Sequence, residues 1–453
     1  MLLDSDVLCV GRGACVAHGA ARNVLTPDLL AQLYGVDVGI GTVKDDLGAL
    51  RRRAHRFYRM NARKVTTIMS IVSARTLDRR TFMKLAGLSL CAGGFLSLSG
   101  CGLDFSKGNL RSITDMGGRR VSLPEQVDRV FCTNPIGTVD VFGLAPEKLA
   151  CWNFRPAGDN KKFIPDEYFA LPSLGVWMGA GAVPNAEEIA AQNPDALLCF
   201  WTADEVGANM ADEVQNQTGL PVVLVDYDVD SAPTTFRFLG DLMGCAERAE
   251  ELASYCEGKL ATIRAVADAV PESERKRVFL AQGNDGLTTD PVGSMHVTDA
   301  FELINTENVA DMPGTQGQGM GMPSVNLEQI INWNPDAVLV AEFSMSDSES
   351  SDIYGEIQQD AHWQNVACVA SGELYRIPRS PFSWFGRPPS AVLILGCLWL
   401  LKVLYPAYAS GINMRDETIE FYRMFYRYDK FDEYTLDNLL SAAGIDPVTG
   451  EKA

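Results

Sequence analysis

The side chains best suited to holding a small molecule are aromatic rings and arginines that follow short apolar runs. Flat rings can bury an apolar macrocycle or an aromatic chelator, and arginines can hold carboxylates or catecholates through paired hydrogen bonds. The pair Met295-His296 has the chemistry of an axial ligand to haem or a corrinoid. With neighbouring polar side chains, the candidate ligand contacts are Asn134, Trp152, Phe154, Arg155, Trp201, Tyr227, Asp285, Met295, His296, Trp384, Phe385 and Arg387.

These candidates also have structural interpretations. Trp152 and Trp201 could be core residues at strand ends, and residues 381–390, with three prolines, could form a rigid packed loop. Arg387 could pair with one of the many carboxylates, and a lone histidine is more often structural than a ligand. We expect about half of the candidates to line a pocket.

Signatures of catalysis are missing from the sequence. It contains no G-x-S-x-G, no G-x-x-x-x-G-K-[ST] and no H-E-x-x-H. After Cys101 only His296 and His362 remain, too few for a zinc or manganese site built on several imidazoles. We therefore expect no catalytic residue, no resident metal and no required cofactor.

Two segments repeat one pattern, N-x-E-x-I-x-x-x-N-P-D-A, starting at Asn185 and Asn326. In each copy the first Asn can cap a helix, and the proline ends that helix because it restricts the residue before it. An apolar run then predicts a buried strand, over residues 196–201 and 337–343. An R-V-F tripeptide precedes each copy, at 129–131 and 277–279. The repeat predicts two lobes of like construction, each a sheet whose strands alternate with helices.

A polar segment, residues 246–270, separates the two lobes. Its apolar residues recur at three- and four-residue steps, which predicts one helix of about seven turns. We predict an α/β fold with an N-terminal lobe at 101–245, a linking helix at 246–270 and a C-terminal lobe at 271–453. Ligand should bind between the lobes, where loops follow the carboxyl ends of the strands. A single linking helix should restrict the relative motion of the lobes.

The first hundred residues contain a pattern typical of a protein export signal. Residues 78–84, D-R-R-T-F-M-K, match the twin-arginine export pattern through Arg79 and Arg80. The apolar stretch 85–98 is shorter than the roughly 20 residues of a membrane span, and L-S-G-C ends at Cys101 like a bacterial lipobox. We predict a lipoprotein signal peptide at 69–100 with lipid attached to Cys101. Residues 1–68 then look like an over-extended gene start, with a genuine leader as the alternative.

Charge and cysteine usage fit an exported protein. The net charge is −19, and residues 1–100 hold 14 Lys and Arg against 7 Asp and Glu, so the remainder carries −26. Such a surface repels nucleic acid, and we expect none as a partner. The seven cysteines after Cys101 include no C-x-x-C, so we expect buried free thiols.

Residues 111–442 resemble a known family, the ABC-importer solute-binding proteins for iron–siderophore, haem and cobalamin. The resemblance begins at 113–124, I-T-D-M-G-G-R-R-V-S-L-P, which is similar to the family's opening hairpin. It includes both N-x-E units and continues through 363–375 and 381–390 to the tail F-Y-R-M-F-Y at 421–426. It implies two Rossmann-like lobes joined by one long α-helix, with the ligand in the cleft between them.

The resemblance also implies partners. Glu187 and Glu328 match the family's two exposed permease-docking glutamates, although each could merely complement its helix dipole. The implied partners are an ABC permease with its ATPase and a small-molecule metal chelate, at the outer face of the cytoplasmic membrane. We expect a monomer whose ligand is a ferric siderophore, haem or corrinoid, with an oxyanion also open. A two-lobed lipoprotein enzyme and a surface sensor without an importer remain the alternatives of another class.

Overall fold

The computed structural model describes residues 109–453 except 157, 178–183, 313–321 and 343–351, and four strands among the earlier residues. The chain forms two compact units, Met1–Leu98 and Ser99–Ala453. In the first, two antiparallel pairs form: β1 (Asp6–Gly11) with β2 (Ala14–Ala20), and β3 (Val38–Lys44) with β4 (Leu50–Arg56). The predicted export and lipid-attachment residues, Arg79, Arg80 and Cys101, lie outside the described residues.

The second unit opens with the predicted hairpin, β5 (Leu110–Thr114) against β6 (Arg120–Pro124). Asp115, at the turn, fixes it in place. Its carboxylate accepts hydrogen bonds from the Arg119 side chain at 2.8 Å and from the backbone N–H of Leu224 at 3.0 Å. A buried ion pair therefore ties the hairpin to a strand more than a hundred residues away.

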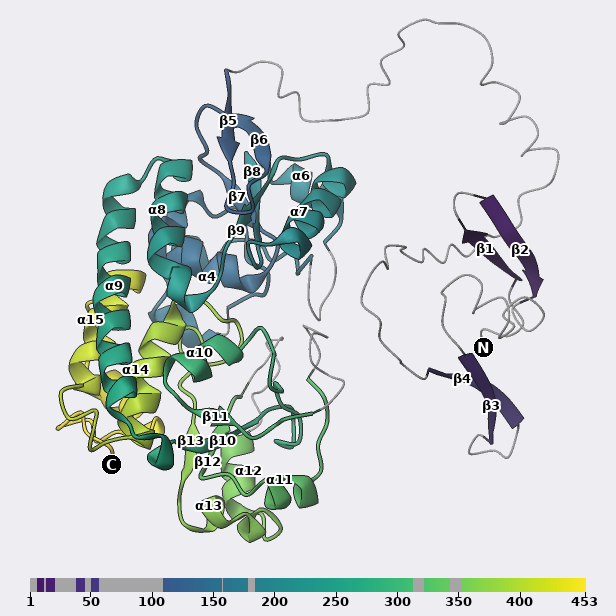
Figure 1. The fold of residues 1–453 in the computed structure, drawn as a ribbon. Helices are drawn as coiled ribbons and strands as arrows, with labels where there is room; N and C mark the ends of the chain where they lie inside the picture. Colours follow the sequence, from purple (N-terminus) through teal and green to yellow (C-terminus); the bar gives the residue numbers. More distant parts are fainter. Residues whose placement is uncertain are drawn as a thin grey trace, which may run out of the picture. The chain divides into compact units, whose positions relative to one another are not determined.

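Two parallel sheets form the two lobes (Figure 1). In the N-terminal sheet, β7 (Val130–Cys132) pairs with β8 (Ala196–Phe200), and β8 with β9 (Val222–Val225). In the C-terminal sheet, β10 (Arg277–Ala281) lies between β11 (Glu307–Asn308) and β12 (Ala337–Val340), and β13 (Leu374–Arg376) follows β12. A parallel bridge from Val130 to Leu149 takes the place that β11 has in the second sheet. Except for the short edge strand β11, the strands are almost wholly buried, as expected where helices cover a parallel sheet.

The repeated motif explains why the two sheets match. Val130 pairs with Ala196 and Val278 with Ala337, so the valine of each R-V-F lies beside the alanine of each N-P-D-A. The motif aspartates, Asp195 and Asp336, accept the backbone N–H of Arg129 and Arg277 respectively, both at 2.8 Å.

The motif arginines make the reciprocal contact with the ends of the repeat helices. Arg129 donates to the Gln192 carbonyl at 2.5 Å and Arg277 to the Trp333 carbonyl at 2.7 Å. The motif asparagines before the prolines, Asn193 and Asn334, adopt left-handed φ values of 50° and 47°, so the pre-proline residue leaves the right-handed helical region, as predicted.

Helices cover both sheets and make up the rest of the unit. Their bounds are α4 (Pro135–Leu144), α5 (Asp166–Phe169), α6 (Ala186–Ala191), α7 (Glu205–Thr218), α8 (Ala232–Met243), α9 (Ala246–Ala269), α10 (Thr298–Leu303), α11 (Leu327–Trp333), α12 (Ile353–Gln359), α13 (Ala367–Ala370), α14 (Val392–Leu404), α15 (Met414–Tyr426) and α16 (Glu433–Ala442).

The helix α9 is the predicted linking helix and runs alongside both lobes (Figure 1). Asn185 and Asn326 cap the repeat helices α6 and α11 as predicted. Their cap bonds differ, because Asn185 accepts from the N–H of Glu187 and Asn326 from that of Gln329. The two-lobed α/β fold joined by one long helix is confirmed.

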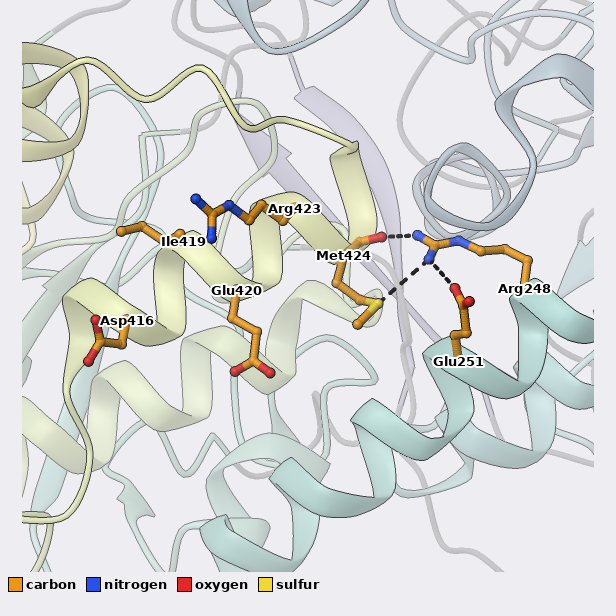
Figure 2. A pocket seen from close by; sticks show the side chains of 7 residues that line it. All are labelled: Arg248, Glu251, Asp416, Ile419, Glu420, Arg423 and Met424. Carbon is orange, nitrogen blue, oxygen red and sulfur yellow. Dashed lines mark hydrogen bonds and ion pairs between the residues drawn. The ribbon is translucent and has the colours of Figure 1, made fainter.

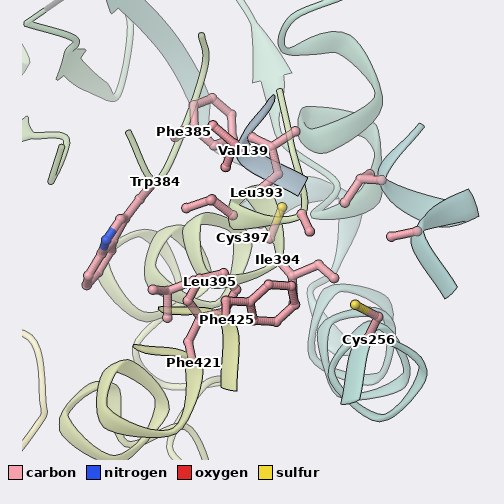
Figure 3. Packing of buried hydrophobic residues seen from close by; sticks show 14 of the residues in the cluster. Val139, Cys256, Trp384, Phe385, Leu393, Ile394, Leu395, Cys397, Phe421 and Phe425 are labelled. Atoms are coloured by element: carbon pink, nitrogen blue, oxygen red, sulfur yellow. The ribbon is translucent and has the colours of Figure 1, made fainter. Parts of the chain in front are cut away.

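The C-terminal helices bind the lobes together. All 13 residues of α14 are buried, and its side chains pack in one core with Val139 of α4 and Cys256 of α9 (Figure 3). The backbone N–H of Ala391, just before α14, donates to Asp140 of α4 at 2.9 Å. In return Arg427, just after α15, donates to the Leu144 carbonyl at the end of α4 at 2.8 Å. Arg427 thus places a cation at the C-terminal end of α4, the polarity that the helix dipole favours.

Six of the seven cysteines after Cys101 are buried and Cys245 is partly buried. Burial raises the pKa of Cys151, Cys199 and Cys368 to about 12, so these thiols stay protonated and unreactive at neutral pH. Within the described part of the chain, no helix is long and apolar enough to cross a membrane.

Candidate functional site

The N-terminal candidates are divided between core and surface. Asn134 caps α4, and its side-chain amide donates to the Phe200 carbonyl at 2.8 Å. Trp152 is buried against Phe142 and donates to the Tyr168 carbonyl at 2.8 Å. Tyr227 is buried, Phe154 and Trp201 are half-buried, and Arg155 is exposed. Arg155, Phe154 and Trp201 are therefore the N-terminal candidates that remain accessible.

The C-terminal candidates include two core residues. Trp384 and Phe385 have no exposed surface, and Phe385 packs on Phe301 with ring centroids 4.9 Å apart. Both residues lie in the segment before α14, and α14 packs against this segment. The structure therefore gives both side chains a packing role. Asp285 is exposed in a turn and accepts the N–H of Leu287, and Met295 is half-buried.

The structure brings two candidates, His296 and Arg387, together around a third residue, Asp290. The Asp290 side chain is fully buried and accepts four hydrogen bonds. Arg387 gives two of them, from Nε at 3.0 Å and from Nη2 at 2.6 Å. Gln282 Nε2, at 2.9 Å, and Ser294 Oγ, at 2.8 Å, give the others. Gln282 directly follows β10, so the cluster lies at the carboxyl end of that strand.

Electrostatics keep the three groups in definite charge states. Burial alone would push the pKa of Asp290 upward, but the hydrogen bonds and charge of Arg387 outweigh it, and the pKa lies below its usual value. Burial, and then the nearby Arg387 charge, lowers the pKa of His296 to about 4. At neutral pH the cluster therefore contains one ion pair and a neutral imidazole.

His296 is unusual for a buried side chain. Only 8% of its surface is exposed, yet neither ring nitrogen has a hydrogen-bond partner among the described residues. Its backbone N–H donates to Ser294 Oγ at 3.3 Å, which links it to the Asp290 cluster. Buried polar groups are normally hydrogen-bonded, and an exception needs an explanation. A neutral imidazole with a free lone pair can coordinate a metal ion.

Several hydroxyl groups are likewise buried without a hydrogen-bond partner among the described residues. The side-chain oxygens of Thr133, Thr288, Thr289, Thr298 and Ser390 are buried without a hydrogen-bond partner in the described structure, and so is Oε1 of Gln282. Thr133 follows β7, and Thr288 pairs through its backbone with Gln282. Several of these unpartnered atoms thus lie after β10 in the C-terminal lobe, and Thr133 lies at the matching place after β7.

A groove of about 720 Å³ lies elsewhere, between α9 and α15 (Figure 2). Its lining is Arg248, Glu251, Asp416, Ile419, Glu420, Arg423 and Met424. Arg248 is already engaged, with Glu251 at 2.7 Å and with the Met424 carbonyl. None of the ligand candidates lines this groove. We favour the Asp290 cluster as the site because the His296 ring and Gln282 Oε1 are buried there without partners in the described structure. The groove, in contrast, is open, and one of its two arginines, Arg248, is already paired.

The predicted docking glutamates are both accessible. Glu187 lies in the first turn of α6 and Glu328 in the first turn of α11, and both side chains are exposed. They occupy equivalent places in the two copies of the repeat. The matching strand register of the two sheets shows the same equivalence.

Sequence reasoning missed Asp290, Ser294 and Gln282. No local signal marks Asp290, one carboxylate among many in an acidic chain. Its importance comes from burial and from a partner 97 positions away.

Known proteins resemble this chain over most of the second unit. The family model described as periplasmic binding protein matches residues 159–381. The molybdate-binding protein MolA of Haemophilus influenzae is 22% identical over 353 residues, which cover 72% of this chain and 93% of that protein. The high-affinity haem uptake system protein IsdE of Staphylococcus aureus is 23% identical over 225 residues, 49% of this chain and 71% of that protein. An ABC transporter solute-binding protein from Sulfurospirillum deleyianum superposes with a TM-score of 0.65 at 26% identity, covering 73% of this chain and 99% of its own.

Proposed function

The chain belongs to the periplasmic binding protein family that serves ABC transporters, and from this membership we propose that it captures an iron complex and delivers it to an importer. The complex is of the ferric-siderophore or haem type, or a related metal chelate, and a cobalamin-type corrinoid is the alternative within the family. The protein acts by binding and release and performs no chemistry of its own.

One observation carries the choice of a metal complex. His296 is buried, neutral at physiological pH and without a hydrogen-bond partner in the described structure. A neutral imidazole can fill an open coordination position of iron in haem or of the metal in a corrinoid. The half-buried Phe154 and Trp201, and the exposed Arg155, are candidates for the rings and the anionic groups of such a complex.

The second candidate ligand is a compact oxyanion. It is favoured by the buried hydroxyls without partners, since neutral donors can hold an oxyanion without a cation. It is also favoured by the molybdate-binding relative, which the alignment covers almost completely.

The direct test is native mass spectrometry of protein purified from its own host, together with an absorption spectrum. A Soret band, a corrin spectrum or the mass of a ferric siderophore supports the proposed class. Co-purified molybdate without an iron complex would favour the oxyanion instead. Turnover of the captured ligand would point to an enzyme.

Delivery to a permease is the second part of the proposed function, with Cys101 as the lipid anchor and Arg79-Arg80 as the export signal. Glu187→Arg combined with Glu328→Arg reverses charge at both exposed docking positions. We expect ligand affinity to stay unchanged and uptake in cells to stop, because the permease should meet these carboxylates with arginines.

A matched control is Glu247→Arg with Glu272→Arg. Both side chains are exposed, near the two ends of α9, and the change in charge is the same. Uptake should survive in this control. Normal uptake by the Glu187/Glu328 variant would rule out the docking role of these two glutamates.

A further inference from the structure

The ion pair of Asp290 and Arg387 leaves a ligand few free hydrogen-bond donors and no net charge to contact. Asp290 is fully buried, Arg387 keeps 14% of its side chain exposed, and two of its three guanidinium nitrogens are bonded to the carboxylate. A planar guanidinium that meets a carboxylate through two parallel bonds is held in position as well as in charge.

A ligand carboxylate cannot readily take Arg387 from Asp290. Such an exchange would leave Asp290 as an uncompensated buried charge, and breaking a buried pair in this way is strongly unfavourable. Gln282 and Ser294 add hydrogen bonds that hold the Asp290 carboxylate in place. Asp290 therefore neutralises the positive charge of Arg387, and this charge is not available to a ligand.

We propose that Asp290 is a specificity-determining residue, which cancels the charge of Arg387 so that this part of the site accepts an uncharged, coordinating face of the ligand at His296 and disfavours a free oxyanion. The inference rests on the proposed function and narrows it. Anionic groups of the ligand then belong on the N-terminal lobe, where Arg155 is exposed. Asp290 acts through Arg387 and need not touch the ligand.

The test compares two probes on the lipid-free exported chain, ferric haem and sodium molybdate. Asp290→Asn keeps the shape of the side chain and releases the Arg387 charge. We expect the affinity for molybdate to rise relative to that for haem by at least ~10-fold, because an uncompensated charge acts strongly in a poorly solvated site. An unchanged ratio would overturn the inference.

A matched control exists in the other lobe. Asp115 is also buried and paired with an arginine, Arg119, at 2.8 Å. Asp115→Asn makes the same change in charge away from the site, so it should lower stability and leave the affinity ratio unchanged. A shift of the ratio in this control equal to that of Asp290→Asn would assign the effect to general destabilisation and would overturn the inference.

The double variant Asp290→Asn with Arg387→Gln keeps the test decisive if the single variant fails to fold. It removes both charges, and replacing a whole buried pair is often tolerated. We expect the wild-type affinity ratio, because the pair is already neutral. A loss of molybdate affinity of ~10-fold or more would mean that Arg387 serves the ligand directly. Wild-type protein that binds no iron complex at all would instead overturn the proposed function.

Discussion

The sheets of the N-terminal and C-terminal lobes begin in the same way and end differently. At the start of the strands, Asp195 and Asp336 hold equivalent backbone positions, and Arg129 and Arg277 reach equivalent helix ends. At the carboxyl ends the copies diverge. In the N-terminal lobe β7 leads directly into α4, a helix almost entirely buried. In the C-terminal lobe β10 leads into a loop that carries Gln282, Asp290 and His296. The duplicated edge maintains the fold, and the divergent edge is free to acquire a site.

The largest expected effect tests that division of roles. His296→Ala removes the unpartnered imidazole, and we expect affinity for an iron complex to fall by at least ~100-fold with little change in stability. Asn153→Ala is the contrast in the N-terminal lobe. Asn153 donates to the carbonyls of Cys132 and Gly175, both at 2.9 Å, so its loss should destabilise the fold by about 1–3 kcal/mol and leave binding unchanged.

Ligand titration and urea denaturation of both variants separate the two roles. If Asn153→Ala weakened binding as much as His296→Ala did, both strand ends would serve the ligand and the comparison would fail. If His296→Ala kept full affinity but lost stability, the imidazole would be a structural residue.

A second comparison concerns two buried carboxylates, Asp290 of the C-terminal lobe and Asp140 of the N-terminal lobe. Asp290 is paired with Arg387, whereas among the described residues Asp140 accepts a single hydrogen bond, from the backbone N–H of Ala391. Burial therefore raises the pKa of Asp140 to about 7. An unfolded aspartate loses its proton near pH 4. Between about pH 4 and 7 the folded protein holds a proton that the unfolded chain has released, so stability falls as the pH rises through this window.

Asp140→Asn should remove that pH dependence. The amide oxygen can still accept the Ala391 N–H and carries no charge. We expect the variant to be more stable than the wild type by roughly 2–4 kcal/mol at pH 8 and close to it at pH 4. Urea denaturation of both proteins at the two pH values measures the difference. A difference that is the same at both would mean that Asp140 is already ionised in the folded state.

The sequence allowed us to predict the helices and strands that the local spacing of residues determines. The N-x-E and N-P-D-A motifs led to α6, α11 and the strands after them, and the three- and four-residue steps led to α9. The sequence could not reveal which residues long-range packing buries. Trp384 and Phe385 have the residue types of a ligand wall, but α14 packs against them, as Gly396 illustrates: a Cβ there would lie 1.9 Å from the Trp384 carbonyl oxygen. Asp290 differs from other acidic residues only through Arg387, which no local pattern reveals.

The smallest expected effect concerns the edge that the two lobes share. Asp195 accepts two backbone N–H groups, those of Asp128 and Arg129, both at 2.8 Å, and is half-buried. Asp336 accepts one, that of Arg277, and is exposed. Asp195→Ala should therefore cost about 1–2 kcal/mol of stability and Asp336→Ala about 0.5–1 kcal/mol, because water can replace a lost partner at the exposed site. Urea denaturation midpoints rank the two. Equal or reversed losses would show that these bonds do not set the strength of the shared edge, and that packing behind β7 and β10 maintains it instead.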